Sequence, residues 1–317
     1  MELIEDIEKI SEPLTNAVVT IGNFDGVHLG HQTLFQKVIE KAGSLGGRSV
    51  AITFEPHPIR VLKQNGQPPL ITIYEQKVEL IARTGIEVLV CIRFTPEFAA
   101  LSPETFVADL LVRRIGMKAI VVGEDYTFGR NREGNLALLQ AYARQYDFEV
   151  ITVGEIQTAN SIVQRISSTK IRDLVTAGEV EIARKLLGRN YQIRGKVVVG
   201  RSRGGSQLGF PTANIEMQDE LCPRTGIYAV TVDFGDRSNP GVANIGYSPT
   251  FDDRQFTVEV YLLDFCGDLY GKQLRVNFVK RLRDEKRFDT LSALSDQIGQ
   301  DVAEARKILA QFTARTV

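Results

Sequence analysis

The spacing of apolar residues changes near residue 187, and this change most constrains the fold. Before it, short apolar runs alternate with segments of helical periodicity; the runs are 18–21, 49–54, 88–92, 119–123 and 148–153. Short apolar strands separated by helices indicate a parallel sheet with both faces covered. After it, β-branched runs follow one another through turns as far as residue 278, which is typical of an antiparallel barrel. The sequence therefore predicts an α/β domain at 1–187 and a β-barrel domain at 188–317.

A final helix is predicted after the barrel strands. Its apolar positions fall on one helical face and are Leu291, Leu294, Ile298, Val302, Ile308 and Leu309. We expect this face to pack against the barrel. At the predicted domain boundary, Gly188 should end a helix at 179–187, because glycine adopts the left-handed conformation that follows many helices.

Charge and cysteine content narrow the classes of partner. The 317 residues carry a formal net charge of −1 and a pI of about 6.4, which argues against a broad nucleic-acid-binding surface. No apolar run approaches the roughly 18–20 residues that span a bilayer, and the acidic N-terminus does not resemble a secretory signal. The cysteines Cys91, Cys222 and Cys266 are far apart, without disulfide or metal-ligand spacing. We predict a cytoplasmic protein with no nucleic-acid or membrane partner, and leave its oligomeric state open.

Two of the three histidines lie directly after the first apolar run. They belong to Gly-Asn-Phe-Asp-Gly-Val-His-Leu-Gly-His at 22–31, which should lie at the ligand-binding C-terminal edge of the sheet. Glycines there let the backbone approach a ligand, and imidazoles can donate hydrogen bonds to phosphoryl oxygens. The candidate phosphate-binding residues are Gly22, Phe24, Asp25, His28, Gly30 and His31. A structural turn explains the His-x-Gly-His motif alone equally well.

A second stretch, Gln-Arg-Ile-Ser-Ser-Thr-Lys-Ile-Arg at 164–172, has the hydroxyl residues of a helix N-cap. The helix start would present N–H groups and the positive end of the helix dipole to an anion. Ser168, Thr169 and Arg172 are therefore candidate anion ligands, and arginine can clamp a phosphate through two hydrogen bonds. Because the chain has no P-loop and no Gly-x-Gly-x-x-Gly fingerprint, the two stretches together predict a nucleotidyltransferase site.

The loop Gly-Glu-Asp-Tyr-Thr-Phe-Gly at 123–129 follows the fourth apolar run and belongs to the same sheet edge. Its aromatic residues, among them Phe128, could flank a planar ring, and Asp125 could fix a polar group. A loop that contributes two aromatic residues to the core is the alternative. His57, in Glu-Pro-His-Pro, is predicted to be a turn residue close to the site.

The barrel domain contains a glycine-rich stretch that ends in Leu-Gly-Phe-Pro-Thr-Ala-Asn at 208–214. Backbone N–H groups around its glycines could converge on an anion; the candidates are Gly200, Gly205 and Gly209. Thr212 and Asn214 are two residues apart in an extended segment, so their side chains should share a face. A hydroxyl and an amide oxygen suit Mg²⁺ that carries nucleotide phosphates.

Glu259 stands in a strongly apolar strand, Val-Glu-Val-Tyr-Leu-Leu at 258–263. A carboxylate is costly there without a partner or a purpose, and phosphoryl transfer to an alcohol needs a group that accepts the hydroxyl proton. Glu259 is thus the candidate base. On pattern alone, an outward-facing strand residue between inward-facing Val258 and Val260 is the favoured interpretation.

Taken together, these stretches resemble the bifunctional prokaryotic riboflavin kinase/FMN adenylyltransferase (FAD synthetase) family from end to end. The motifs that carry the resemblance occur in the same order and lie at 22–31, 123–129, 165–172, 208–214 and 258–265. The resemblance implies that the barrel phosphorylates riboflavin with ATP. It implies that the N-terminal domain then joins FMN to the AMP part of a second ATP and releases pyrophosphate, forming FAD.

In the N-terminal domain, the resemblance implies that His28 and His31 contact ATP phosphates from one side. Ser168, Thr169 and Arg172 would lie on the other side. A further implication is that Asp125 positions the flavin or a metal. No base would be required, because the FMN phosphate is already a nucleophile.

In the barrel, the resemblance implies that Thr212 and Asn214 hold Mg²⁺ and that Glu259 accepts the proton of the ribityl 5′-hydroxyl. The chain departs from the family pattern at Ser248, where an arginine is usual, at Tyr261, where a histidine is common, and in the loop 200–207. These departures leave kinase rate and flavin affinity open. An adenylyltransferase whose barrel binds flavin without kinase activity is the alternative, and a flavin-responsive regulatory protein is a third interpretation.

Overall fold

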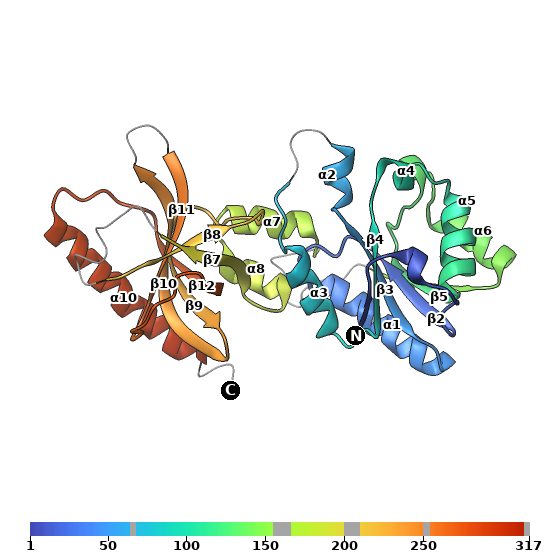
Figure 1. Cartoon of the computed structure of the whole chain (residues 1–317), viewed down its shortest axis with the longest axis horizontal. Helices are drawn as coiled ribbons and strands as arrows, with labels where there is room; N and C mark the ends of the chain where they lie inside the picture. The colour runs from blue at the N-terminus through green and yellow to red at the C-terminus, as the bar shows by residue number, and fades with distance from the viewer. Residues whose placement is uncertain (64–67, 155–165, 200–209, 250–253, 314–317) are drawn as a thin grey trace. The chain divides into compact units, whose positions relative to one another are not determined.

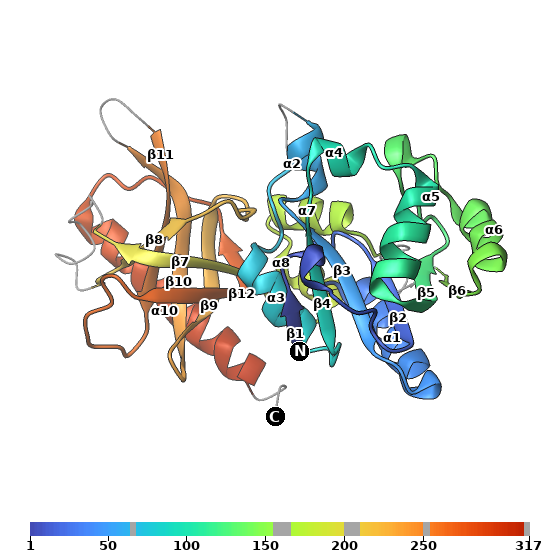
Figure 2. The same cartoon turned by 45° about the vertical axis from the view of Figure 1, so that its right-hand side comes forward.

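The computed structural model of the chain describes residues 1–63, 68–154, 166–199, 210–249 and 254–313. These residues form two compact units, Met1–Ser168 and Thr169–Val317 (Figure 1). The first unit contains a six-stranded sheet and the second a closed barrel, which Figure 2 shows from a second direction. The two predicted architectures are therefore confirmed.

All strand pairs of the first sheet are parallel. The strands lie in the order β1 (Glu2–Ile4), β4 (Val88–Arg93), β3 (Ser49–Glu55), β2 (Ala17–Ile21), β5 (Met117–Gly123) and β6 (Glu149–Val153). The five strands expected from apolar runs are present, whereas β1 is too short to give a sequence signal. The strand order reverses between β2 and β5, and the C-terminal ends of strands at such a point form ligand-binding crevices.

Helices cover both faces of this sheet (Figure 1). On one face, α1 (Leu29–Leu45) and α3 (Tyr74–Ala82) contribute buried apolar side chains that meet alternate residues of the strands, Val18 among them. On the other face, a π-helix (Phe106–Ile115) and α6 (Leu136–Tyr146) pack over Val19 and its counterparts. The shorter helices are Ile7–Lys9, α2 (Pro58–Leu62), α4 (Pro96–Ala99), α5 (Pro103–Thr105) and Arg130–Arg132.

The barrel strands pair antiparallel and close on themselves. Their order is β10 (Arg237–Pro249), β11 (Arg254–Leu262), β8 (Ala213–Met217), β7 (Tyr191–Val198), β12 (Gln273–Arg283) and β9 (Gly226–Phe234). Two helices, α7 (Ser168–Thr176) and α8 (Val180–Leu187), precede the barrel. Gly188 ends α8 in the left-handed conformation with φ 73°, as predicted.

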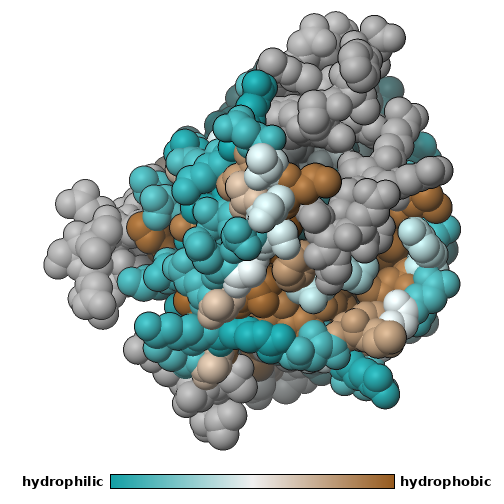
Figure 3. Space-filling model, turned by 90° about the vertical axis from the view of Figure 1, so that its left-hand side faces the viewer, coloured by the Kyte–Doolittle hydropathy of each residue, from teal (hydrophilic) through white to brown (hydrophobic). Residues whose placement is uncertain are grey.

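The C-terminal helix α10 (Leu291–Thr313) packs on the barrel as expected. Its buried contacts come from the second half of the helix and are Val302, Ala305, Ile308, Leu309 and Phe312. Leu291 is instead 64% exposed, because the packed part of the helix begins only at Val302. Figure 3 shows one face of the molecule on which small hydrophobic patches lie between hydrophilic side chains.

A bidentate ion pair fixes α10 to the barrel. Arg283 on β12 donates to Asp301 on α10 through Nε and Nη2, at 2.8 and 2.6 Å, and both side chains are largely buried. Within the part of the chain that the structure describes, no helix has the length and apolar character needed to cross a membrane.

Candidate active sites

The histidine stretch forms a tight loop between β2 and α1. Phe24 and Val27 adopt positive φ angles of 49° and 39°, a conformation that side chains of this kind rarely adopt without constraint. The Phe24 ring is 2% exposed and packs against Phe35, with ring centroids 4.8 Å apart. A Cβ at Gly22 would lie 2.9 Å from the Phe24 ring, so glycine is required where the loop begins.

The two histidines of this loop lie ring on ring. His28 is the N-cap of α1, and its Nδ1 accepts the backbone N–H of His31 at 3.3 Å. The two imidazoles stack with centroids 3.6 Å apart and planes at 17°. Because Nδ1 of His28 accepts a hydrogen bond, the proton of its neutral ring lies on Nε2. Nε2 is therefore the nitrogen that can donate to a phosphoryl oxygen.

Asp25 holds the loop against a distant segment of the chain. Its carboxylate accepts the backbone N–H groups of Ile71 and Thr72, each at 3.0 Å, and the Thr72 hydroxyl at 3.3 Å. The Thr72 hydroxyl in turn accepts the N–H of Gly26 at 3.0 Å. Asp25 is 2% exposed. Sequence reasoning missed Thr72, since no local signal links it to residue 25.

The second predicted anion-binding stretch meets this loop. Ser168 is the first residue of α7, and its Oγ donates to the backbone carbonyl of Asp25 at 2.9 Å. Thr169 and Arg172 follow on the same helix, in the second compact unit, and their roles stay predictions. His57 is the N-cap of α2, with its Nδ1 accepting the N–H of Ile59 at 3.2 Å, in agreement with a turn residue.

A cavity of about 360 Å³ opens where β2, β5 and β6 end. The predicted residues that line it are Gly22, Phe24, His28, Gly30, His31, Asp125 and Ser168. Tyr126, one of the two aromatic residues expected to flank a planar ring, also lines it. Glu124 and Gly154 line it as well, although sequence reasoning did not select them. The structure thus gathers two stretches more than 130 residues apart (22–31 and 166–168) at the point where the strand order reverses.

The two aromatic residues of the loop after β5 take different positions. Tyr126 lines the cavity, and burial raises the pKa of its phenol, which keeps it neutral. Phe128 is 6% exposed and lies in the core, stacked on Tyr126 with centroids 5.5 Å apart. The core alternative therefore describes Phe128 better than ligand contact does. Asp125 is exposed at the cavity.

In the barrel, strand register brings three polar residues into one row. Glu259 on β11 is paired with Asn214 on β8 and with Asn244 on β10. Directly paired residues point to the same face of a sheet. Their neighbours Val258 and Val260 are 2% and 0% exposed, so the row faces outward from the closed barrel. The outward orientation favoured by pattern alone is present, and it places Glu259 beside Asn214.

The surroundings of Glu259 favour a proton acceptor. Burial and the nearby Glu285 carboxylate raise the pKa of Glu259, and burial raises the pKa of Glu285 as well. A Cβ at Gly246 would overlap the Glu285 carboxylate, so this acid lies directly over β10. The Oδ1 of Asn244 is buried and has no hydrogen-bond partner among the described residues. These acceptors suit a ligand that donates through hydroxyl groups.

Of the two predicted metal ligands, Asn214 lies on the outer face: its neighbour Ala213 is 9% exposed, so alternation along β8 directs the Asn214 side chain away from the barrel interior. Thr212 directly precedes β8, and its place on the same face stays a prediction. Among the described residues, no group of three or more His, Cys, Asp or Glu side chains could hold a metal by itself. A hydroxyl and an amide oxygen fit Mg²⁺ only if nucleotide oxygens and water complete its coordination.

The remaining predicted kinase residues are only partly described. Gly200, Gly205 and Gly209 lie outside the described residues, as does the whole of the unusual loop 200–207. Tyr261 lies two residues beyond Glu259 and packs edge-on against Phe210, with centroids 5.4 Å apart. Ser248 belongs to β10.

Comparisons with known proteins agree across the whole chain. A family model for FAD synthetase matches residues 10–170, and one for riboflavin kinase matches residues 187–309. The bifunctional riboflavin kinase/FMN adenylyltransferase of Escherichia coli K12 is 38% identical over 309 residues, 97% of each chain. That of Listeria monocytogenes is 39% identical over 300 residues, 94% of each chain.

A solved structure shares the complete architecture. A crystal structure from Streptococcus pneumoniae, described as that of a macrolide-efflux protein, superposes with a TM-score of 0.86 at 33% identity and covers 96% of this chain and 98% of its own. From these matches and the motifs gathered at both sites, we conclude that the chain belongs to the bifunctional riboflavin kinase/FMN adenylyltransferase family.

Proposed function

We propose that the chain makes FAD from riboflavin in two steps. The barrel transfers the terminal phosphoryl group of ATP to riboflavin and yields FMN and ADP; the N-terminal unit joins FMN to AMP from a second ATP and releases pyrophosphate. One observation carries the proposal: each unit gathers motifs that are distant in sequence. Ser168 meets Asp25 in the first unit, and Asn214 is paired with Glu259 in the second.

For adenylyl transfer, we assign charge stabilisation to the stacked histidines. Nε2 of His28 can donate to a phosphoryl oxygen of ATP, and His31 would donate from the neighbouring ring. Gly22 and Gly30 leave room for phosphates against the backbone. An oxygen of the FMN phosphate attacks the α-phosphorus and the bond to pyrophosphate breaks, so positioning and charge stabilisation suffice without a base.

The other predicted residues of this site divide into two roles. Asp25 positions the loop, because its carboxylate already accepts the amides of Ile71 and Thr72. Asp125 and Tyr126 would contact the flavin, with Phe128 supporting the Tyr126 ring. Thr169 and Arg172 would complete the phosphate contacts from α7, as the sequence predicts.

For phosphorylation of riboflavin, Glu259 accepts the proton of the ribityl 5′-hydroxyl as the oxygen attacks the γ-phosphorus. Its raised pKa makes it a better acceptor than an ordinary carboxylate. Thr212 and Asn214 would hold Mg²⁺, which would neutralise charge on the ATP phosphates when bound. The glycines of 200–209 stay sequence-based candidates for the phosphate contacts.

We place the functional boundary at 187/188, where α8 ends and Gly188 follows. The compact units divide earlier, between Ser168 and Thr169, and the two family matches leave residues 171–186 between them. We also propose a cytoplasmic location and small-molecule partners; the weak net charge argues against a broad nucleic-acid-binding surface. Separate assays of residues 1–187 and 188–317 test the boundary: FAD formation from FMN should be found only in the first fragment.

The decisive experiment uses the whole protein with riboflavin, ATP and Mg²⁺. FMN should accumulate first and FAD second, as measured by chromatography of the flavins. Glu259→Ala should abolish FMN formation and leave FAD formation from supplied FMN intact, whereas Glu304→Ala, an exposed carboxylate on α10, should change neither. A wild-type barrel that forms no FMN would instead support the kinase-inactive alternative.

A further inference from the structure

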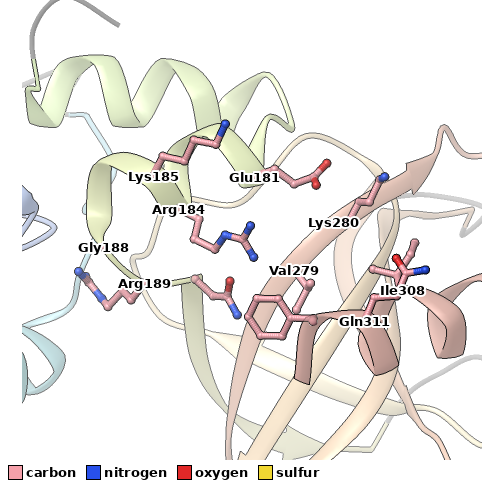
Figure 4. A pocket seen from close by; sticks show the side chains of 11 residues that line it. Glu181, Arg184, Lys185, Gly188, Arg189, Val279, Lys280, Ile308 and Gln311 are labelled. Carbon is pink, nitrogen blue, oxygen red and sulfur yellow. The ribbon is translucent and has the colours of Figure 1, made fainter. Parts of the chain in front are cut away.

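We propose that a second cavity in the barrel unit binds a mononucleotide-like compound: a planar ring, a hydroxylated chain and one phosphate group. The cavity lies between α8, the segment 188–190 that precedes β7, strand β12 and the end of α10 (Figure 4). Its volume of about 740 Å³ is in the range of small-molecule sites. None of its lining residues belongs to either active site assigned above.

The phosphate is assigned to two cations from different elements. Arg184 extends from α8 into the cavity, and Lys280 rises from the facing strand β12 (Figure 4). Neither forms an ion pair within the described part of the chain. Basic residues in the last turn of a helix stabilise its dipole, which accounts for Arg184 and its neighbour Lys185 on α8. That explanation does not extend to Lys280, and both cations face the cavity, where they can bind a ligand anion.

The planar ring is assigned to the apolar wall. The ring centroid of Phe312 on α10 lies 5.1 Å from the guanidinium carbon of Arg184, an arrangement in which a cation is attracted to one face of an aromatic ring. Val279 and Ile308 continue this wall, and Val279 is 3% exposed. A heteroaromatic ring could pack there while its phosphate reaches the two cations.

The hydroxylated chain is assigned to two acceptors between these ends. The carboxylate of Glu181 points into the cavity on the side of Lys280 (Figure 4), without an ion pair in the described residues. The Oδ1 of Asn190 is buried and also lacks a hydrogen-bond partner there. Both atoms can accept hydrogen bonds from ribose or ribityl hydroxyls. The negative charge of Glu181 disfavours a polyphosphate beside it, so the expected ligand carries a single phosphate group.

The chain has no tryptophan, which makes a local binding reporter available. In the full-length protein, Phe312→Trp places a unique emitter in the cavity wall, and Gln311→Trp is a second reporter in case the first perturbs folding. We would titrate each with FMN and with AMP in separate arms, using fluorescence lifetime so that flavin absorption does not interfere. Riboflavin and adenosine are the matched compounds without phosphate.

The expected result is saturable quenching by at least one phosphorylated compound, with riboflavin or adenosine binding about tenfold or more weakly. Arg184→Gln and Lys280→Gln should each weaken binding about tenfold. Lys307→Gln is the matched control, because Lys307 is exposed on α10, the helix that carries Phe312, and does not line the cavity. Absence of quenching by FMN and AMP with both reporters would overturn the proposal. So would equal quenching by the unphosphorylated compounds, or quenching that both cation variants leave unchanged.

Discussion

The two candidate active sites differ in how their polar side chains are held. In the first unit, the Asp25 carboxylate accepts two amides, Nδ1 of His28 accepts the His31 amide, and the Ser168 hydroxyl donates to a carbonyl. In the barrel, strand pairing aligns Asn214, Glu259 and Asn244. There the Oδ1 of Asn244 has no partner in the described residues.

This difference predicts how substitutions at the two sites affect the stability of the protein and its two activities. Hydrogen bonds within the protein fix the adenylyltransferase loop, so substitutions there should affect folding and catalysis together. Strand pairing positions the row of Asn214, Glu259 and Asn244 in the barrel. The Glu259 carboxylate of this row and the nearby Glu285 carboxylate lie in surroundings that disfavour their charge. Substitutions in the row should therefore reduce activity at little or no cost in stability, as is common for groups kept for function.

The largest expected effect is that of Glu259→Gln. Loss of the proton acceptor should lower the rate of FMN formation by about 10²–10⁴-fold, while FAD formation from FMN stays normal. Since burial and Glu285 disfavour the Glu259 charge, the neutral variant should melt at the same temperature as wild type or slightly higher. Coupled assays and calorimetry measure both. A clear drop in melting temperature would show that Glu259 stabilises the fold. It would contradict the expectation that substitutions in the barrel row cost little stability.

His28 allows the two roles of one side chain to be separated. Both His28→Asn and His28→Ala remove the Nε2 donor and should lower adenylyl transfer by about 10²–10³-fold. Asparagine can still cap α1, whereas alanine should cost about 1 kcal/mol of stability. Denaturant unfolding and pyrophosphate release are the measurements. Equal stability of the two variants would show that the cap seen at His28 is energetically unimportant.

Asp25→Asn tests the loop contact directly. The amide replaces a carboxylate that accepts the N–H groups of Ile71 and Thr72, and should lower the free energy of unfolding by roughly 1–3 kcal/mol. FAD formation should weaken, with kinase activity unchanged. Asp109→Asn, which alters an exposed helical ion pair with Arg113, is the control and should cost less than about 0.5 kcal/mol. If Asp25 contacted only substrate, its substitution would leave the unfolding curve unchanged.

Much of the fold could be predicted from local patterns. Continuous apolar runs marked the parallel strands, because those strands are covered on both faces, and Gly188 marked the end of α8. Two features could not be predicted. The three-residue strand β1 gives too little periodicity, and Leu291 matches the apolar face of α10 although the packed half begins at Val302.

Site residues could be predicted where they lie together in one stretch of the sequence. They could not be predicted where they meet only through strand pairing or the tertiary fold. Glycines, histidines and hydroxyl residues identified the phosphate-binding stretches, but Thr72 reaches residue 25 through the tertiary fold alone. Asn244 and Glu285 join Glu259 only through barrel register and the return of the chain after β12. Phe128 was selected as a ligand contact because an aromatic residue in a loop can serve a ligand or the core, and only packing distinguishes them.

The smallest expected effect is a change in the pH dependence of FMN formation. It is also the sharpest test of the row of Asn214, Glu259 and Asn244. A carboxylate base works only when it is ionised, so FMN formation should fall as pH drops through the raised pKa of Glu259. Glu285→Gln removes a negative charge that helps to raise this pKa, and the acidic limb of kcat/KM should move to lower pH. The profile of FAD formation should stay in place. Had the shift of Glu259 come from burial alone, the limb would not move, and the outer face would hold one functional carboxylate instead of a coupled pair.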